Sequence, residues 1–275
     1  KPAHKMASGS ALEETMIERT ARLFPGRLAP APGRIYAWGK VGGKGGYALP
    51  VAPSEVDRDG DCVFPARCTS DAIFLKTSVD VGPFCALDVM GRVWAWHGWG
   101  QTDRWPTAPK PVLDGCMDCA AGGGFIVAAK ADGSVWMLGK APSPTPLPDA
   151  RGGWTRLASR CDAAAFVAVD ACEGVVMAAT AEGLLFSCGR GAALGLDAET
   201  SSVGTAALTA VPEVPPVCSF SAGSLHGACA GRDDGSVWVW GDGLSGNHGL
   251  GQRRNAQVPT RVPALLAAKQ QKAEV

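Results

Sequence analysis

Residues 217–265 run VCSFSAGSLHGACAGRDDGSVWVWGDGLSGNHGLGQRRNAQVPTRVPAL, and the segment at their centre, GSVWVWG at 235–241, recurs in altered form along the chain. The related segments begin at residues 33, 91, 133 and 183, where the sequence is GRIYAWG, GRVWAWH, GSVWMLG and GLLFSCG. A repeat period near 50 residues is typical of solenoids and β-propellers.

Each repeated segment is predicted to be a β-strand, because it is rich in β-branched and aromatic residues and is bracketed by glycine. Side chains alternate along a strand, so Trp238 and Trp240 share one face while Val237 and Val239 share the other. Both faces are apolar, and such a strand must be covered on both sides. Blades stacked around a propeller axis meet this requirement.

A second apolar run precedes most of these segments and leads into a short turn. The turns carry the pairs Met90-Gly91, Asp132-Gly133, Glu182-Gly183 and Asp234-Gly235. An Asp-Gly pair between two apolar runs is a strong signal for a hairpin whose two turn residues both have positive φ. The sequence therefore predicts antiparallel hairpins and an all-β fold.

Composition limits the possible functions. The 275 residues include 26 basic and 26 acidic side chains, so the formal net charge is zero, and 46% of the residues are hydrophobic. This balance excludes a disordered chain and argues against direct nucleic-acid binding, which requires a basic excess. The sequence has no apolar run long enough for a transmembrane helix, so membrane insertion is not expected. Ten scattered cysteines favour reduced thiols in an intracellular protein of undetermined compartment.

The last repeat resembles the repeat of the regulator of chromosome condensation family. That repeat contains A-G-x-x-H, then D-G-x-V-x-x-W-G, then a loop with G-x-L-G and a Pro-x-x-Val element. The matching residues here are Ala222-Gly223, His226, Asp234-Gly235, Val237, Trp240-Gly241 and Gly249-Leu250-Gly251. The GLG element recurs loosely as Leu194-Gly195-Leu196, and the resemblance covers about residues 33 to 265.

The resemblance implies an all-β fold, a β-propeller that in this family has usually seven blades, and a histidine that bonds backbone between blades. We expect an N-terminal extension over 1–30, the propeller over 31–268, and a tail or the start of a further blade over 269–275. About five repeats are recognisable, and seven would take about 350 residues. Either the ring continues beyond this sequence, or another chain or the N-terminal segment covers the open edge.

The N-terminal segment predicts a short helix near residues 11–24. Ser10 and Glu13 fit a capping box, and Pro25-Gly26 would end the helix. Its imperfect apolar stripe suits packing on the propeller itself or docking on a partner.

The sequence shows no catalytic constellation. The pair Cys116 and Cys119 is a weak zinc signal, because a structural site needs four ligands. The glycine-rich stretch 39–46 departs from a phosphate-binding loop in spacing and lacks the Ser or Thr that holds Mg²⁺. We therefore expect neither an enzyme nor a bound cofactor or metal.

Two loops have the composition of protein-binding surfaces. Trp99 and Trp105 flank a loop that also carries Asp103 and Arg104, and tryptophan and arginine are enriched in interface hot spots. The second candidate is the basic loop tip Arg253, Arg254 and Asn255 in the last repeat.

These observations favour a non-catalytic propeller scaffold that mediates protein–protein interaction as a subunit of a larger assembly. The expected partners are one or more proteins. The alternative, implied by the family resemblance, is a guanine-nucleotide exchange factor for a small GTPase. Fold analogy alone is a weak argument for that activity.

Overall fold

The computed structural model describes residues 36–40, 61–67, 72–79, 83–96, 109–141 and 144–263. These residues form a nearly all-β structure of four four-stranded antiparallel sheets and one further strand pair, β1 (Tyr36–Lys40) with β2 (Asp61–Arg67). We call the four sheets blades I to IV, in chain order. The helix predicted near residues 11–24 lies outside the described residues.

Each blade uses four strands that follow one another in the sequence. Blade I contains β3 (Phe74–Val79), β4 (Phe84–Asp88), β5 (Val93–Trp96) and β6 (Lys110–Leu113). Blade II contains β7 (Cys116–Gly122), β8 (Phe125–Lys130), β9 (Val135–Gly139) and β10 (Ala150–Arg156). Blade III contains β11 (Phe166–Cys172), β12 (Val175–Thr180), β13 (Leu185–Gly189) and β14 (Thr205–Ala210). Blade IV contains β15 (Val217–Ala222), β16 (His226–Gly231), β17 (Val237–Gly241) and β18 (Ala256–Arg261).

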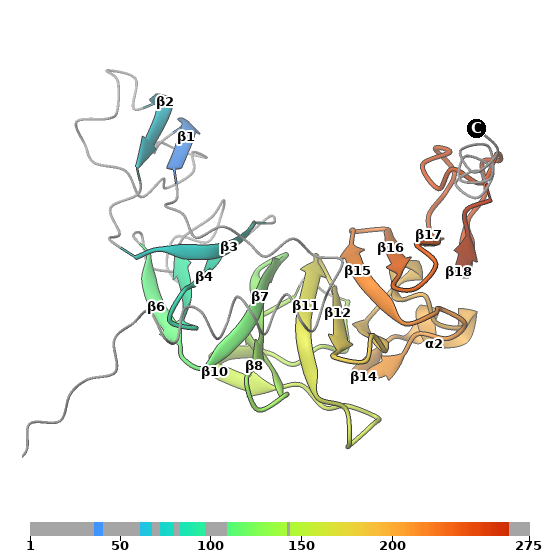
Figure 1. The fold of residues 1–275 in the computed structure, drawn as a ribbon, viewed down its shortest axis with the longest axis horizontal. Coiled ribbons are helices and arrows are strands. Elements are labelled where there is room, and N and C mark those ends of the chain that lie inside the picture. The colour runs from blue at the N-terminus through green and yellow to red at the C-terminus, as the bar shows by residue number, and fades with distance from the viewer. Residues whose placement is uncertain are drawn as a thin grey trace, which may run out of the picture.

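The blades stand side by side in chain order, and their first strands lie next to one another (Figure 1). A hollow of about 240 Å³ is lined jointly by residues of β3, β11 and β15, so these first strands surround a common axis. The third strands β5, β9, β13 and β17 occupy the segments that carry the repeated sequence pattern. Blade IV is at one end of the row (Figure 1).

The D-G-S-x-W sequence builds the turn before the third strand. In blade II, Asp132 Oδ1 accepts a hydrogen bond from Ser134 N at 2.9 Å, and Trp136 Nε1 donates to Ser134 Oγ at 2.7 Å. Blade IV repeats this arrangement with Asp234, Ser236 and Trp238. In each turn the aspartate carboxylate accepts from the backbone N–H of the serine, and the serine hydroxyl accepts from the tryptophan indole N–H. The three side-chain types are therefore needed together, which explains why the motif recurs.

The predicted turn geometry is wrong in one respect. The glycine of each turn has positive φ, 83° at Gly133 and 60° at Gly235, but the preceding aspartates do not. Gly133 N donates to Lys130 O, so the chain turns before it reaches the glycine. A left-handed residue is needed only at the glycine, as in hairpins of three or more loop residues.

The glycine that closes the third strand is required by two constraints. Gly241 has φ of 99°, and a Cβ atom there would overlap the carbonyl oxygen of Leu225. Gly189 occupies the same place in blade III, with φ of 118° and Gly174 O in the way. Only glycine combines positive φ with so close a backbone approach.

Gly241→Ala is therefore expected to lower the free energy of unfolding by about 1–3 kcal/mol from the strained φ alone, and further through the clash. Urea denaturation followed by far-UV circular dichroism measures the change. Gly152→Ala is the matched control, because open space surrounds that glycine in β10 and its φ is not positive. Equal stability losses in the two variants would contradict this explanation of the closing glycine.

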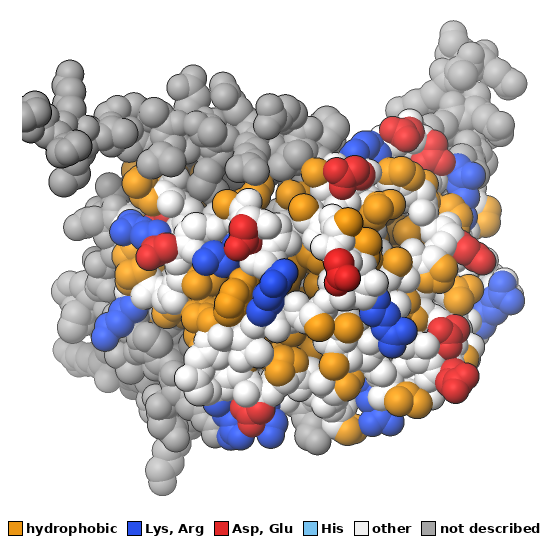
Figure 2. All heavy atoms as spheres, turned by 90° about the horizontal axis from the view of Figure 1, so that it is seen from below, with side chains coloured by type: hydrophobic (Ala, Val, Ile, Leu, Met, Phe, Trp, Pro, Cys, Tyr) orange, Lys and Arg blue, Asp and Glu red, His pale blue; other side chains and the backbone are white. Residues whose placement is uncertain are grey.

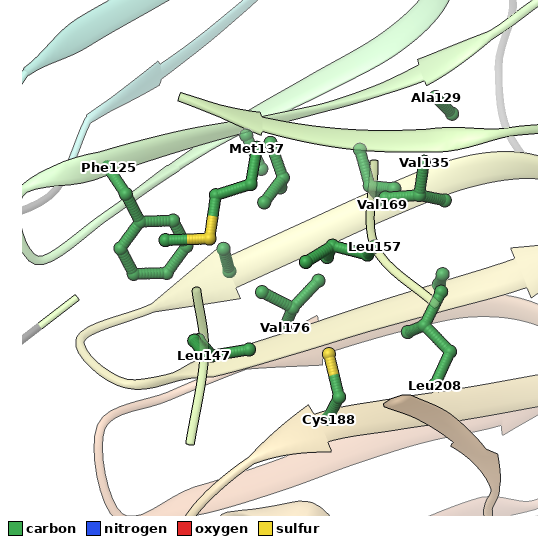
Figure 3. Packing of buried hydrophobic residues seen from close by; sticks show 14 of the residues in the cluster. Phe125, Ala129, Val135, Met137, Leu147, Leu157, Val169, Val176, Cys188 and Leu208 are labelled. Carbon is green, nitrogen blue, oxygen red and sulfur yellow. The ribbon is translucent and has the colours of Figure 1, made fainter. Parts of the chain in front are cut away.

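Apolar side chains fill the space between neighbouring blades. Figure 3 shows the layer between blades II and III, where Phe125 and Met137 of blade II meet Val169 and Val176 of blade III. All four side chains are buried. Corresponding layers lie between blades I and II and between blades III and IV. The sheets of blades II and III are each covered by a neighbouring blade on both faces, which is why their strands are apolar on both faces.

Asp118 joins the first strands of three blades through a partly buried ion pair and a hydrogen bond. Lys76 Nζ of blade I lies 2.7 Å from Asp118 Oδ1 of blade II, and Asp118 is 4% exposed. Asp118 Oδ2 also accepts a hydrogen bond from Val169 N of blade III at 3.0 Å. A buried carboxylate is tolerated here because charged and polar groups on both sides satisfy it.

The Leu194-Gly195-Leu196 element of blade III covers a tryptophan of blade IV. Trp240 is fully buried, and its Nε1 donates to Ala193 O at 2.7 Å. A side chain on Gly195 would collide with the indole ring. The GLG element is thus the lid of the next blade's tryptophan, which explains its place after the third strand.

The loop that carries this element also contains the helix α2 (Ala198–Val203), which the sequence did not predict. Asp197 caps it by accepting a hydrogen bond from Thr200 N at 2.8 Å. In the described part of the chain, no helix has the length and apolar character needed to cross a membrane.

The described cysteines are free thiols, and most are buried. Cys116 and Cys119 lie in β7, where burial raises the pKa of Cys116 to about 12. Among the residues of known placement, no group of three or more His, Cys, Asp or Glu side chains is arranged to hold a metal ion.

Cys161 should react much faster with iodoacetamide than Cys188. Cys161 is exposed, whereas Cys188 is fully buried and burial raises its pKa to about 12, so its nucleophilic thiolate is scarce. Peptide mapping of the native protein after brief labelling at pH 8 measures both sites. Equal labelling of the two cysteines would contradict the packing of β13.

Candidate protein-interaction surface

Two loops meet at one end of blade IV. The first is the turn between β15 and β16, which contains Leu225, and the second joins β17 to β18 over residues 242–255. Asp242 N donates to Leu225 O at 2.9 Å, so the two loops are held together at their bases. This contact places their outer residues on one surface.

Side-chain hydrogen bonds shape the longer loop. Leu244 N donates to Asp242 Oδ1 at 2.9 Å, and Gly243 N donates to Asn255 Oδ1 at 3.1 Å. The second bond joins the two ends of the loop across twelve residues. Such local side-chain-to-backbone bonds fix loops that have no ladder of their own.

His248 fills the inside of the loop. Its side chain is 4% exposed and packs against Gly243, where a Cβ atom would collide with the ring. Neither ring nitrogen has a hydrogen-bond partner in the described part of the chain. Burial lowers the pKa of His248, and the neighbouring His226 lowers it further. The ring is therefore neutral near pH 7 and fills the inside of the loop.

Acid is expected to destabilise this loop through His248. Because the folded-state pKa lies below the ordinary value of 6.5, the unfolded chain takes up a proton first as the pH falls. The stabilisation that neutral His248 contributes to the folded state is fully present above pH 6.5. It is lost as the pH falls from 6.5 to below the lowered pKa of the folded state.

Urea denaturation at pH 7.5 and at pH 5.5 measures this effect in the parent chain and in His248→Leu. The fall in stability between the two pH values should be smaller in the variant. An equal fall in both proteins would show that His248 does not contribute.

Two leucines and two arginines dominate the exposed surface of these loops. Leu225 is 57% exposed and Leu244 is 60% exposed. Arg253 and Arg254 are also exposed, and Gly246 lies beside the Arg253 stem. We call Leu225, Leu244, Arg253 and Arg254 the loop surface. It combines apolar area with positive charge and contains no catalytic or metal-binding arrangement.

Comparison with solved structures shows which fold the four blades represent. Prp20p from Saccharomyces cerevisiae, whose binding properties to Gsp1p and histones are described with its crystal structure, superposes with a TM-score of 0.66 at 22% identity. The chain folds as a regulator of chromosome condensation-like propeller. Human WBSCR16 superposes with a TM-score of 0.64 at 20% identity. The predicted all-β propeller is confirmed.

The likeness covers most of this chain but only part of the known structures. It covers 84% of this chain and 59% of the Prp20p chain, and 78% of this chain and 60% of the WBSCR16 chain. A yeast RCC1 (Prp20) structure bound to Kap60 gives a similar result, at 57% of that chain. No protein-family model matches the sequence, and no curated protein matches it.

The residues that the sequence predicted for a binding surface do not all have the same role in the structure. Arg253 and Arg254 are exposed on the loop surface. Asn255 is also exposed, but its side chain accepts the bond from Gly243 N and so positions the loop. The other candidates, Trp99, Asp103, Arg104 and Trp105, lie outside the described residues.

His226 differs from what the family resemblance implied. Its side chain is exposed, and within the described residues its ring makes no hydrogen bond to a neighbouring blade. Its backbone carbonyl instead accepts from Gly223 N at 2.8 Å. His226 begins β16 on a side of blade IV that no described blade covers, so its ring has no neighbouring blade to bond to among the described residues.

Sequence reasoning missed Leu225 and Leu244. A usable signal was present, since each is a lone large apolar residue between small or polar loop residues. Charges elsewhere are mixed: on the face shown in Figure 2, basic and acidic side chains are scattered among uncharged ones. The loop surface combines two consecutive exposed arginines with two exposed leucines on adjoining loops.

Proposed function

We propose that this propeller is a non-catalytic scaffold that binds another protein through the loop surface, as a subunit of a larger assembly. The observation that carries the proposal is the exposure of Leu225 and Leu244 on two adjoining loops, the longer of which is held in shape by internal hydrogen bonds. Preformed loops lose little entropy on binding, and binding residues are often presented on loops by a rigid scaffold.

The surface indicates the chemistry of the partner. Burying the two leucines requires an apolar side chain opposite them, and Arg253 and Arg254 favour carboxylates beside it. An acidic segment with one or two apolar anchors meets both requirements. Electrostatic steering by the arginines makes the association rate depend on salt.

The test is affinity purification of the tagged chain from its native cells, followed by rebinding of the recovered partner in purified form. The double variant Arg253→Glu, Arg254→Glu and the single variant Leu244→Ser should each weaken the rebinding about tenfold or more. Higher salt should reduce the association rate of the parent chain but raise that of the double variant, because salt screens the repulsion between its glutamates and an acidic partner.

Leu184→Ser is the matched control. Leu184 is 54% exposed, but it lies in the turn before β13 of blade III and outside the loop surface. This variant should bind like the parent chain. Undiminished binding by both loop variants would overturn the proposal.

A guanine-nucleotide exchange factor for a small GTPase is the second candidate, favoured by the fold likeness to Prp20p and its reported binding to Gsp1p. Release of a fluorescent guanine nucleotide from purified GTPases distinguishes the two functions. Acceleration by catalytic amounts of the chain supports exchange activity, and no acceleration across the GTPases removes this candidate.

A further inference from the structure

The outer edge of each blade is the free side of its fourth strand. A backbone hydrogen bond to the third strand ends the pairing of these two strands in three blades, and its donors are Leu157 N, Val211 N and Val262 N. Backbone groups alternate in direction along a strand, so the residues one and three positions before each donor point their N–H and C=O groups away from the sheet. In β10 these outward residues are Arg156 and Trp154.

Proline interrupts the outer edges of blades I and IV. In blade I, Pro111 occupies the place that Arg156 holds in blade II, since both pair with the second residue of the third strand. In blade IV, Pro259 lies at the other outward position, three residues before Val262. Proline has no N–H to offer an incoming strand, so it protects a sheet edge from pairing with another chain.

The outer edge of blade III is covered by a segment of this chain. Leu208 N donates to Ala158 O at 2.8 Å, and Arg160 N donates to Leu208 O at 2.9 Å. Ser159 thereby forms a parallel bridge with Leu208, which is an outward residue of β14. The edge of a blade in this propeller therefore accepts an extended segment that runs parallel to the fourth strand.

The outer edge of β10 has neither form of protection. Its sequence contains no proline, and the backbone N–H groups of Trp154 and Arg156 have no partner among the described residues. Gly152 and Gly153 beside them are exposed, and a Cβ atom built on either would meet nothing within 4 Å. An unprotected edge of this kind is a template for pairing with another chain.

The charges along this edge favour an acidic partner. Residues 150–161 contain Arg151, Arg156 and Arg160 and no carboxylate. Arg151 is paired with Asp149, whereas Arg156 and Arg160 are exposed and form no ion pair within the part of the chain that the structure describes. Arginine binds a carboxylate through two parallel N–H donors, so these two side chains suit Asp or Glu on an incoming segment.

A hollow of about 390 Å³ begins where this edge ends, and its lining includes Arg156 and the apolar residues Val135, Leu157 and Phe166. A segment that lies along β10 and runs parallel to it leads into this hollow, because Leu157 directly follows the strand. The hollow can therefore receive an apolar side chain at the C-terminal end of such a segment.

We propose that the outer edge of β10 binds an extended acidic segment of a partner protein, which adds to blade II as a fifth strand parallel to β10. Its backbone exchanges hydrogen bonds with Trp154 and Arg156, in the way that residues 158–160 exchange them with Leu208. A carboxylate of the segment pairs with the Arg156 guanidinium, and an apolar side chain at its C-terminal end enters the hollow. In β-strand addition the backbone gives affinity and such side chains give specificity.

The probe is a phage-displayed library of random peptides of about nine residues, which is long enough for a strand. Selection uses the full chain carrying Leu244→Ser, Arg253→Glu and Arg254→Glu, so that the loop surface does not capture acidic peptides. The selected peptides should be enriched in Asp and Glu, and binding to the parent chain is measured by fluorescence polarisation. Hydrogen exchange should show that peptide binding protects the amides of Trp154 and Arg156, because hydrogen-bonded amides exchange slowly.

Arg156→Pro is the decisive variant. It gives blade II the residue that blade I already carries at the equivalent position, Pro111, so the blade should still fold. The loss of both an edge N–H and the guanidinium should weaken peptide binding about tenfold or more. Arg156→Ala, which keeps the N–H, should weaken it less. Ala210→Pro is the matched control at the equivalent position of β14 and should leave binding unchanged.

A peptide methylated at successive backbone nitrogens tests the added strand directly. Methylation should weaken binding at alternate residues only, because every second N–H of an added strand faces the sheet edge. The proposal is overturned by a selection that yields no binding peptide, by peptides that bind Arg156→Pro as tightly as the parent chain, or by exchange protection outside residues 151–157.

A dimer of the parent chain that Arg156→Pro dissociates in sedimentation would also overturn the proposal, because the occupant would then be a second copy. The edge of β10 and the loop surface lie on different blades, and the selection removes the loop surface. Either proposal therefore stands if the other fails.

Discussion

Replacing Trp240 with alanine is expected to lower the free energy of unfolding by about 3–5 kcal/mol, one of the two largest losses in this propeller. The indole is fully buried between blades III and IV, and its Nε1 holds the carbonyl of Ala193. The substitution leaves a cavity beneath the Leu194-Gly195-Leu196 lid and an unpartnered carbonyl.

Urea denaturation followed by far-UV circular dichroism measures this loss without depending on tryptophan fluorescence. Trp238→Ala is the matched control, because that indole is only partly buried and bonds within its own turn to Ser236. The control should lose clearly less stability. A loss at Trp240 no larger than at Trp238 would contradict the role of the lid.

Asp118→Ala is expected to lower the free energy of unfolding by about 2–4 kcal/mol, because it removes the buried carboxylate of a partly buried ion pair. The change leaves the Lys76 ammonium without this carboxylate and Val169 N without its acceptor, in contacts that join three blades. Cooperative unfolding measured by two probes reports whether the blades still unfold together.

A double-mutant cycle with Lys76→Met separates the pair from its surroundings. In the Asp118→Ala background, Lys76→Met should cost less than in the parent chain, because the Lys76 ammonium no longer has the Asp118 carboxylate to pair with. Equal costs in both backgrounds would show that the ion pair contributes nothing to the contact between blades.

The sequence was informative about strands and much less so about the contacts between them. Glycine-bracketed apolar segments such as 235–241 revealed the third strands, because alternation and turn residues are local signals. The outer strands β10 and β14 gave no comparable pattern, since ARGGWTR and TAALTA lack a clear apolar alternation. The helix α2 was missed because its six residues are too few to show a helical periodicity.

The candidate surface was predictable only in part. Arg253 and Arg254 were visible as a basic loop tip, whereas Asn255 proved to position the loop. The role of Asp118 could not be read from the chain. Its partners, at residues 76 and 169, are distant in the sequence and lie beside it only in the folded chain.

The hydrogen bonds that join the first strands also bear on how such a chain can change over time. Where Ser78, Asp118 or Asp170 is the acceptor, the donor is a backbone N–H of the following blade. Every residue except proline supplies that donor. A duplicated unit can therefore change the side chain at the donor position and still make this contact, provided that its predecessor keeps a short polar side chain. At this contact, sequence change is tolerated in the blade that supplies the backbone N–H and is restricted in the blade that supplies the acceptor side chain. The arrangement of the blades can therefore persist after the sequence repeat has become hard to recognise at these positions.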